Sequence, residues 1–469
     1  MTVLREDPAR LLDPADRRLV AAAAGTVCVV AAAGALVGPV APAVAAALGL
    51  LVLTARVPAA ATWIYLGALP FLSGIDRGRL VPLVRPNEAL LVLLVAGVLA
   101  GAYLRRLRGV PLRLRFGPLD APLALFLVVG TVWPPVSLLL RGHDPSAGDL
   151  AALLPLVKLT GLLLLARTTV VTPSQRRWLF RVVVGSAVVV AVVAVLQTLG
   201  FPPVLHLLGT LWTSSESPVD MSERGTTMFA SSIATGDHLV LAVALLVGAA
   251  ARGMVGRRTA VATGAVLAAG ILATGQFSSW AAAAVAGVVL VRRYPPRWPR
   301  ASRLVPAVLL LVAVGAPAVL TRLSEFGGEF GVPRSWLGRW DNLTSFYLPR
   351  IDLSAVLLGI SPNSVLPAPE TWREQIYLEF GYLQLLWVGG VALPAAFAVL
   401  SWHVVRRCAV LVHDPGEVGV AATAVLAAWW VVLILSVIDI HLTLRGTGDV
   451  LFVLLGIVGR PVDDDRVQG

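Results

Sequence analysis

Two glutamates lie where a polar stretch of the chain meets an apolar one. Glu374 and Glu379 belong to "WREQIYLEFGYLQLLWVGG", residues 372 to 390, and Arg373 directly precedes the first of them. A carboxylate that is partly removed from water has a raised pKa, which suits the role of a general base. The aromatic residues of this stretch would also anchor the chain at a membrane interface, but anchoring does not explain the glutamates. We therefore predict that Glu379 and Glu374 are catalytic.

A second candidate is an arginine that stands just before an apolar run. Arg224 opens the segment "RGTTMFASSIATGDHLVLAVALLVGAA". Guanidinium groups bind phosphate oxygens through two parallel hydrogen bonds and stay charged at every relevant pH. Arg224 is therefore either a solvated loop arginine or a ligand for a phosphate group.

Ionisable residues also occur inside the apolar runs. Asp237 and His238 lie well within the run that follows Arg224, and Lys158 stands in the middle of "LLPLVKLTGLLLL". A charge at the centre of a bilayer costs roughly 3 kcal/mol or more, so such residues face the interior of a helix bundle. We expect Lys158 and Asp237 to form a buried ion pair. The alternative is a transporter in which these residues form an internal relay.

A further group of ionisable residues lies near the C-terminal end. The segment "SVIDIHLTLRGTGDV" places Asp439, His441 and Arg445 in a turn between two apolar runs, a weak motif. The chain contains no HExxH, no Walker loop and no GxSxG motif. Its two cysteines, Cys28 and Cys408, are too far apart in sequence to suggest a metal site. We expect no metal and no cofactor.

The composition decides which elements must position these residues. Of 469 residues, 57% are hydrophobic and 14% are charged, and the mean hydropathy is +0.82. Soluble domains carry about 25% charged residues, so this is the composition of a multi-pass membrane protein. Helices are the expected spanning form, because the runs lack the alternation of a β-barrel. The predicted fold is an all-α bundle of about 12 to 14 spans. The spans are expected at about 19 to 38, 40 to 55, 58 to 74, 88 to 104, 119 to 140, 149 to 167, 178 to 200, 227 to 250, 259 to 275, 278 to 291, 304 to 320, 376 to 402, 418 to 438 and 446 to 460.

Arginine-rich loops set the expected orientation. They recur in every second loop, which places those loops and both tails, residues 1–18 and 461–469, in the cytoplasm. Residues 19–460 then form one transmembrane domain in the inner (plasma) membrane. The net charge of +11 arises from these loops, so nucleic acid is not an expected partner. The exception is an outward loop at residues 76 to 86, which carries three arginines. Either an early span is misassigned or that loop binds an anion.

Two outward loops are too long to be simple connectors. They cover residues 201 to 226 and residues 321 to 375, and loops longer than about 15 residues are usually functional or disordered. The second contains "RSWLGRWDNLTSFYLPR", which is rich in Trp, Tyr, Phe and Arg. This pattern predicts an ordered, amphipathic cap at the membrane interface.

The order of these motifs resembles that of the O-antigen ligase and polymerase family of bacterial membrane glycosyltransferases. In that family an arginine opens an "R-x-G-x-F" segment, a span with "S-R-G/S-W" follows, and a large external loop ends in "E/H-x-G-Y-L-x-L-L-x-x-G-G". The corresponding segments here are "RGTTMFASSIATGDH", "LATGQFSSWAAAAVAGVVL" and "EFGYLQLLWVGG", and the resemblance covers roughly residues 150 to 400. It implies a GT-C-like helical fold and a metal-independent, inverting transfer of a glycan from undecaprenyl diphosphate.

The resemblance also implies roles for individual residues. Arg224 and Arg339 match family arginines that would hold the donor diphosphate and stabilise its charge as it leaves. Glu379 occupies the position where ligases tend to carry a histidine base. Four aromatic residues of the loop would contact sugar rings or the lipid: Trp336, Trp340, Tyr347 and Trp372.

Two departures from the family pattern limit what the resemblance implies. The ligase histidine is absent, which favours a polymerase-like or divergent member over a lipid A ligase. The serine and arginine of the following span are replaced by "FSSW". The expected partners are a polyprenyl-diphosphate-linked glycan, a glycan, lipid or protein acceptor, and membrane lipid. The alternatives are a transporter or flippase that uses the buried charges, and an inactive scaffold.

Overall fold

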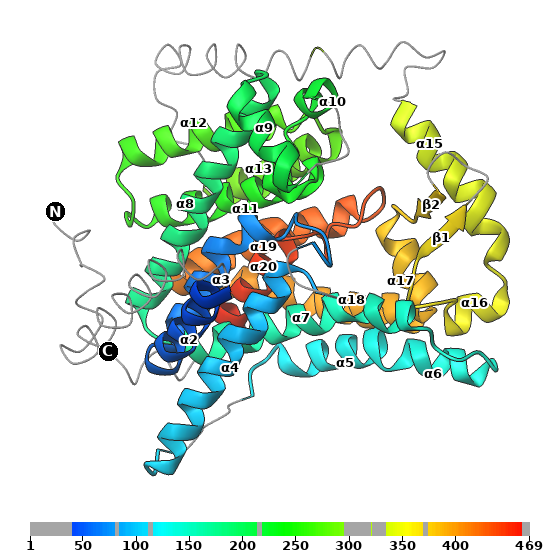
Figure 1. Ribbon diagram of the computed structural model, residues 1–469, viewed down its shortest axis with the longest axis horizontal. Helices are drawn as coiled ribbons and strands as arrows, with labels where there is room; N and C mark the ends of the chain where they lie inside the picture. Colours follow the sequence, from blue (N-terminus) through cyan, green and yellow to red (C-terminus); the bar gives the residue numbers. More distant parts are fainter. Residues whose placement is uncertain are drawn as a thin grey trace.

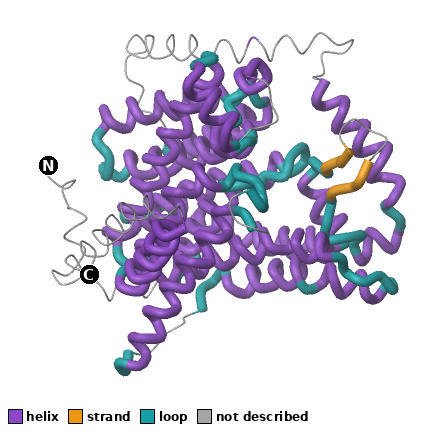
Figure 2. The backbone as a smooth tube through the Cα atoms, viewed as in Figure 1, coloured by secondary structure: helices purple, strands orange, loops and turns teal. Residues whose placement is uncertain are grey.

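The computed structural model describes residues 40–79, 84–110, 116–212, 218–294, 320, 334–368 and 374–461. The tails, the predicted first span, all but the last residue of the predicted span at 304 to 320, the first part of the external loop and Trp372 lie outside these residues. Helices dominate, and the described strands are confined to one small sheet (Figures 1 and 2).

The helices are, in chain order, α2 (Val40–Arg56), α3 (Pro58–Leu72), α4 (Pro86–Leu107), α5 (Asp120–Thr131), α6 (Trp133–Leu140), α7 (Ala147–Thr169), α8 (Pro173–Thr198), α9 (Pro202–Leu211), α10 (Pro218–Glu223), α11 (Ser232–Ala251), α12 (Arg257–Ala273), α13 (Phe277–Arg293), α15 (Arg334–Asn342), α16 (Leu353–Leu358), α17 (Gly381–Gly389), α18 (Ala392–Leu411), α19 (Glu417–Leu435) and α20 (Thr447–Val458). Shorter turns are η2 (Thr227–Phe229), η4 (Leu343–Tyr347) and η5 (Leu348–Arg350), and the strands are β1 (Val365–Ala368) and β2 (Glu374–Tyr377).

Six of the described helical segments are long and apolar enough to cross a membrane. They are Pro86–Leu107, Asp120–Leu140, Ala147–Thr169, Pro173–Thr198, Ser232–Ala251 and Glu417–Leu435. Each coincides with a predicted span. Capping residues help to fix their ends, because the side chains of Ser146 and Thr172 accept hydrogen bonds from the first turns of α7 and α8. The mostly helical fold predicted from the sequence is therefore found in the structure, with six described segments that could span a membrane.

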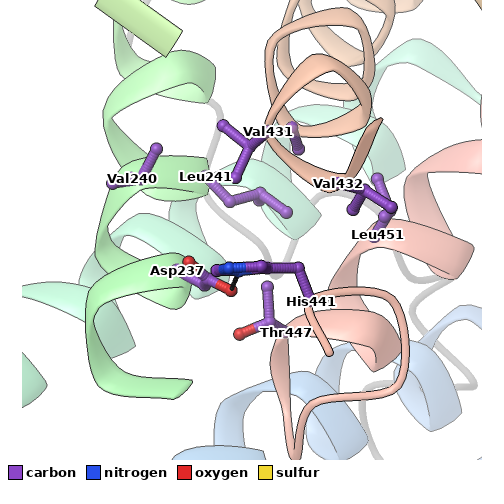
Figure 3. A pocket seen from close by; sticks show the side chains of 9 residues that line it. Asp237, Val240, Leu241, Val431, Val432, His441, Thr447 and Leu451 are labelled. Carbon is purple, nitrogen blue, oxygen red and sulfur yellow. Dashed lines mark hydrogen bonds and ion pairs between the residues drawn. The ribbon is translucent and has the colours of Figure 1, made fainter. Parts of the chain in front are cut away.

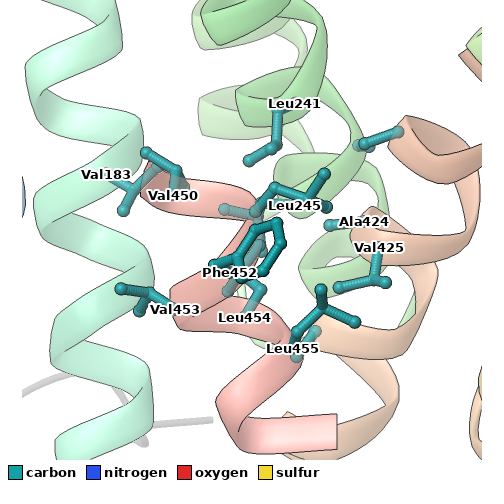
Figure 4. Close-up of a cluster of buried hydrophobic side chains, with 14 of the residues drawn as sticks. Val183, Leu241, Leu245, Ala424, Val425, Val450, Phe452, Val453, Leu454 and Leu455 are labelled. Atoms are coloured by element: carbon teal, nitrogen blue, oxygen red, sulfur yellow. The ribbon is translucent and has the colours of Figure 1, made fainter. Parts of the chain in front are cut away.

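The interior of the bundle is formed by α11, α19 and α20. The most apolar windows of α11 and α19 are 78% buried, against 28% for those of α4 and α7. Every residue of α20 is buried. Phe452 and Leu454 of α20 contribute to a cluster with Leu241 and Leu245 of α11 and Val425 of α19 (Figure 4). The helices α4 and α7 therefore have more surface free for lipid, whereas α20 has none.

One predicted span is not a continuous helix. We expected a single helix over residues 376 to 402, but the structure has β2, α17 and α18 there. The break falls at Gly390, where φ is +59°, and a Cβ there would lie 2.3 Å from the carbonyl oxygen of Leu357. The chain turns at this glycine because only a residue without a side chain permits both that angle and the close approach of the end of α16.

The described part of the external loop is folded. It forms α15, α16 and the hairpin of β1 and β2, in which Val365 pairs with Tyr377, on one side of the bundle (Figure 1). A small core of its own contains Tyr347, Ile376 and Trp387. The loop thus forms a structured lobe that packs on α17.

An irregular segment joins α19 to α20. Residues 436–446, called the re-entrant segment below, contain turns and bends but no helix. The 12 residues of α20 span about 18 Å at 1.5 Å each, which is much less than the roughly 30 Å of a bilayer core. The re-entrant segment leads directly into α20, and it carries the buried polar side chains of Asp439 and His441 into the bundle.

Candidate functional site

The re-entrant segment brings together ionisable residues from distant parts of the chain. Its own ionisable residues are Asp439, His441 and Arg445. Asp439 contacts the external lobe, His441 contacts α11, and Arg445 contacts the turn after α3. We take this segment and its partners as the candidate functional site.

Arg339 of the external lobe joins three elements at one end of the segment. Its Nε lies 2.5 Å from Oε2 of Glu379, just before α17, and its Nη1 lies 3.2 Å from Oδ2 of Asp439. Nη1 also donates to the backbone oxygen of Ile438 at 3.2 Å. The Arg339 side chain is only 14% exposed. Two of the predicted site residues, Arg339 and Glu379, are therefore in direct contact, and Asp439 joins them.

Asp439 is held in a poorly solvated position. Burial raises the pKa of its carboxyl group above the usual value, although Arg339, His441 and Ser278 act in the opposite direction. One guanidinium thus lies between two carboxylates, one of them buried and the other a third exposed. Such an arginine can exchange a carboxylate partner for a phosphate at little cost in desolvation.

His441 and Asp237 form a buried pair in the middle of the site. Nδ1 of His441 donates to Oδ2 of Asp237 at 2.6 Å, and Nε2 of His441 has no hydrogen-bond partner within the described residues. Both face a cavity of about 10 Å³ between α11, α19 and α20, with Thr447 beside them (Figure 3). A cavity of that volume holds roughly one water molecule.

The pair determines the protonation of the histidine. Burial lowers the pKa of His441, but the charge and hydrogen bond of Asp237, with the charge of Asp439, outweigh it, so the pKa is raised above its ordinary value of 6.5. A histidine oriented by a carboxylate in this way can take up and release a proton at Nε2.

The expected ion pair between Lys158 and Asp237 is wrong. Nζ of Lys158 lies 2.7 Å from Oδ1 of Asp449 in α20, and the hydroxyl of Tyr65 donates to the same oxygen at 2.7 Å. The reason is helix packing, because α7 packs closely against α20. Asp237 on α11 takes His441 instead. Each buried carboxylate therefore has a cationic partner, but not the one expected from sequence.

His238 follows Asp237 but has a different environment. It is fully buried, neither ring nitrogen has a hydrogen-bond partner in the described part of the chain, and its ring tilts against Phe229 at 5.1 Å between centroids. Its role is packing against η2. The predicted relay through Lys158, Asp237 and His238 is therefore not continuous, because no hydrogen bond joins these three side chains among the described residues.

Arg224 is carried by another set of elements. It follows α10, and the backbone N–H of the next residue, Gly225, donates to the carbonyl of Ala273 at the end of α12 at 2.9 Å. Gln197 at the end of α8 accepts from the N–H of Thr227 at 2.9 Å. In Figure 1 α10 lies apart from α15, which carries Arg339. Arg224 is thus firmly positioned, and its convergence with Arg339 and Glu379 stays a prediction.

The predicted aromatic contacts divide into two groups. Trp336 is 42% exposed and Trp340 is 61% exposed, so both rings are available to a ligand. Tyr347 is fully buried, and its hydroxyl donates to the carbonyls of Ser364 and Ile376, so the structure gives it a packing role in place of the predicted sugar contact. Glu374 lies in β2, where its backbone pairs with Ala368, and its side chain lies outside the described residues.

Comparison of the chain with models of protein families, with curated proteins and with solved structures gave no match.

Sequence reasoning gave too little weight to the re-entrant segment. Asp439 lies 3.2 Å from Arg339, His441 is the partner of Asp237, and Asp449 is the partner of Lys158. The signal that could have found them is the density of ionisable residues in "DIHLTLRGTGD" between two apolar runs. In a membrane protein such residues are expensive to bury, so several within one short segment indicate a site.

Proposed function

We propose that this protein is a membrane glycosyltransferase of the O-antigen ligase or polymerase type. It would act on the outer face of the plasma membrane, transferring or polymerising a glycan from undecaprenyl diphosphate in the synthesis of cell-envelope polysaccharide. The proposal includes a GT-C-like bundle of 12 to 14 spans with both termini in the cytoplasm. No metal is required, because diphosphate is already a good leaving group.

The observation that carries the proposal is the contact between Arg339 and Glu379. The sequence predicts that Arg339 is a diphosphate ligand and that Glu379 is a general base. Nε of Arg339 lies 2.5 Å from Oε2 of Glu379, although Arg339 belongs to α15 of the external lobe and Glu379 directly precedes α17. The exposed rings of Trp336 and Trp340 lie on the same helix as Arg339. Arginine, carboxylate and aromatic surface are the three components that transfer from a lipid-linked sugar needs.

The contact suggests how the donor prepares the site. In the absence of substrate, Arg339 neutralises Glu379, which makes that carboxylate a poor base. A donor diphosphate that binds Arg339 would release Glu379 to accept the proton of an acceptor hydroxyl. The acceptor oxygen then bonds to the anomeric carbon, the bond from that carbon to the diphosphate oxygen breaks, and the leaving diphosphate takes the electron pair. Arg224 and Arg339 would stabilise its charge.

The test uses purified full-length protein with a lipid-linked oligosaccharide, and measures chain growth or transfer by gel electrophoresis and mass spectrometry. We expect Glu379→Gln to lower kcat about 10²- to 10⁴-fold, the usual contribution of a general base. Arg339→Lys and Arg224→Ala should each lower it roughly 10²- to 10³-fold, as for the loss of one charge-stabilising donor. Arg350→Ala is the matched control, because Arg350 is an exposed arginine of the same lobe. Unchanged activity in both Arg224→Ala and Arg339→Lys would refute the proposal.

A second candidate function is supported by the buried ionisable pairs. Asp237 pairs with His441 beside a small cavity, and Lys158 pairs with Asp449 elsewhere in the bundle. Ionisable residues inside a membrane protein often belong to proton relays of transporters. If the protein is a transporter or flippase, Asp237→Asn should abolish transport of the substrate, whereas Glu379→Gln should still transport it. Transport into proteoliposomes, measured for both variants, separates the two functions. The absence of both activities from the wild-type protein would leave an inactive scaffold for glycan assembly.

A further inference from the structure

Three arginines gather at the opposite end of the re-entrant segment from Arg339. Arg77 lies in the turn after α3, Arg85 caps the N-terminus of α4, and Arg445 ends the re-entrant segment. We call these residues the arginine corner. The turn η2 holds the loop after α3 near the end of the re-entrant segment. The carbonyl of Met228 is in close contact with Gly74, and the ring of Phe229 is in close contact with Gly446.

The carboxylates near the arginine corner are too few to neutralise it. Nη2 of Arg77 lies 3.2 Å from Oε1 of Glu88, and Nη1 of Arg445 lies 3.7 Å from Oδ1 of Asp76. Three arginines therefore face two carboxylates, which leaves a formal excess of one positive charge. The intervening residues 80–83 read "LVPL" and bring no charge.

Of the three arginines, Arg85 has the surroundings that stabilise its positive charge least. Glu88 accepts from its backbone N–H at 3.1 Å, but the Nε atom of its side chain is buried and has no hydrogen-bond partner within the described residues. Burial lowers the pKa of Arg85 to about 10, and the charges of Arg445 and Arg77 add to this effect. A half-buried guanidinium that faces two others, with an unused donor, is stabilised when an anion binds.

We propose that Arg77, Arg85 and Arg445 bind a phosphate group, from a lipid headgroup or a free phosphate ion. The side chains of Arg77 and Arg445 are 35% and 36% exposed, so a ligand can reach them. Three guanidinium groups from two distant segments suit a group that presents several oxygens, and arginine binds phosphate with two parallel hydrogen bonds. The site differs from the diphosphate site at Arg224 and Arg339, and it does not depend on glycosyl transfer.

The site also accounts for the arginine-rich outward loop at residues 76 to 86. Short outward loops of membrane proteins are usually poor in arginine. Arg79 of the same loop donates to the carbonyl of Thr210 in α9 at 2.6 Å, which ties the turn to the neighbouring outward loop. A bound phosphate would compensate the remaining arginines, so the loop need not be assigned to the cytoplasmic side.

The experiment has two arms on purified full-length protein. In the first, protein in phosphatidylcholine nanodiscs is titrated with inorganic pyrophosphate in a calorimeter. In the second, nanodiscs also contain phosphatidylglycerol, and the lipid that stays bound after transfer to detergent is measured by mass spectrometry. We expect Arg85→Gln and Arg445→Gln to weaken binding in at least one arm about tenfold, the usual loss for one charge-assisted hydrogen bond.

Matched variants make the outcome decisive. Arg350→Gln removes an exposed arginine elsewhere and should change neither arm. Asp76→Asn removes a competing carboxylate and should tighten binding. A loss confined to the pyrophosphate arm assigns the site to free phosphate, and a loss confined to the phosphatidylglycerol arm assigns it to a lipid. The Arg445 side chain is 36% exposed, so Arg445→Gln should still fold. If folded Arg445→Gln binds as the wild type does in both arms, the proposal is overturned. Unchanged transfer in both Arg224→Ala and Arg339→Lys, with intact binding at the arginine corner, would refute only the proposed function.

Discussion

At the scale of single residues, the site consists of ionisable side chains that each meet a partner from a distant segment. His441 and Asp237 are 204 positions apart, and Arg339 and Asp439 are 100 apart. Breaking a buried pair by removing one partner costs about 3 to 5 kcal/mol, because the other charge stays buried. These pairs therefore connect the stability of the bundle directly to the chemistry of the site.

The His441 pair predicts a dependence of stability on pH. The folded protein binds the histidine proton more tightly than the unfolded chain, because the pKa of His441 is raised above 6.5. Its contribution is fully present below pH 6.5 and is lost as the pH rises through the folded pKa. The free energy of unfolding should therefore fall across this range, and the Tm of the wild type, measured by differential scanning fluorimetry in detergent, should fall with it.

His441→Asn should remove this pH-dependent part of the stability. His403→Asn is the matched control, since His403 is exposed and its substitution should preserve the slope of the wild type. If His441→Asn keeps the slope, another group is responsible for it.

The Lys158 pair gives a prediction about stability alone. Asp449→Ala leaves the ammonium of Lys158 and the hydroxyl of Tyr65 without their acceptor, and should cost about 3 to 5 kcal/mol. The double variant Lys158→Met with Asp449→Leu removes both charges and should recover most of that loss. Thermal unfolding in detergent measures both.

The more exposed pair of Arg177 and Glu417 is the control. Arg177→Gln should cost less than Asp449→Ala, because the Arg177 side chain is 32% exposed. Equal losses in Arg177→Gln and Asp449→Ala would show that burial does not set the energy of these pairs.

At the scale of elements, glycines decide where the chain departs from a continuous helix. Gly390 separates α17 from α18 and receives the end of α16, so that the external lobe is attached to the bundle at this point. Glu379, which precedes α17, and Arg339 of the lobe meet only if this attachment holds. The geometry of the candidate site therefore depends on a residue that has no functional group.

Gly390→Ala should weaken the attachment of the lobe. The new methyl group would require a positive φ and would lie 2.3 Å from the carbonyl oxygen of Leu357, so we expect a loss of about 1 to 3 kcal/mol. Faster proteolysis between α15 and α17, with a lower Tm, is the expected result. Gly185→Ala in α8 has free space for its methyl group and should be neutral or slightly stabilising. A Gly390→Ala protein as resistant as Gly185→Ala would contradict this role.

Most helices were predictable because their apolar runs are long. The predicted spans at 88 to 104, 149 to 167 and 418 to 438 each overlap one helix closely, with ends that differ by a few residues. The break at Gly390 was missed because the residues around it are apolar, and hydropathy does not report backbone angles. The length of a run therefore predicts a helix more reliably than it predicts the continuity of that helix.

The candidate site was predictable only in part, because pairing depends on which helices are neighbours. Arg339 and Glu379 were chosen from the order of motifs, and they do meet. Lys158 and Asp237 were matched by depth, but α7 packs on α20 and not on α11, which changes both partners. Periodicity gives the buried face of a helix without saying what covers that face.

At the scale of the whole molecule, the two ends of the bundle differ in chemistry. Arg252 at the end of α11 donates to the hydroxyl of Tyr294 after α13 and to the carbonyls of Val412 and Asp414 between α18 and α19. These helix ends therefore meet at one face. The opposite ends of α11 and α19 lead to Asp237 and to the re-entrant segment. Arginine-rich ends and the candidate site thus lie on opposite sides of the interior helices.

Labelling of single cysteines tests the proposed orientation. In a background without Cys28 and Cys408, Ser345→Cys in the lobe should react with a membrane-impermeant maleimide on intact cells. Arg258→Cys at the start of α12 should react only after permeabilisation, because loops rich in arginine stay in the cytoplasm. Both positions are exposed, so access through the membrane is the only variable. The reverse pattern would place the candidate site on the cytoplasmic side.

The short, fully enclosed α20 has a consequence for the electric potential around the site. Its first turn lies inside the bundle, where the aligned peptide dipoles of a helix act as roughly +0.5 elementary charge at the N-terminus. Asp449 in that turn accepts a hydrogen bond from the backbone N–H of Gly446 at 3.1 Å, and it also pairs with Lys158. In a poorly polarisable interior such a charge acts over a longer range than it would in water. The N-terminus of α20 and the ammonium of Lys158 therefore both stabilise the negative charge of Asp449 inside the bundle.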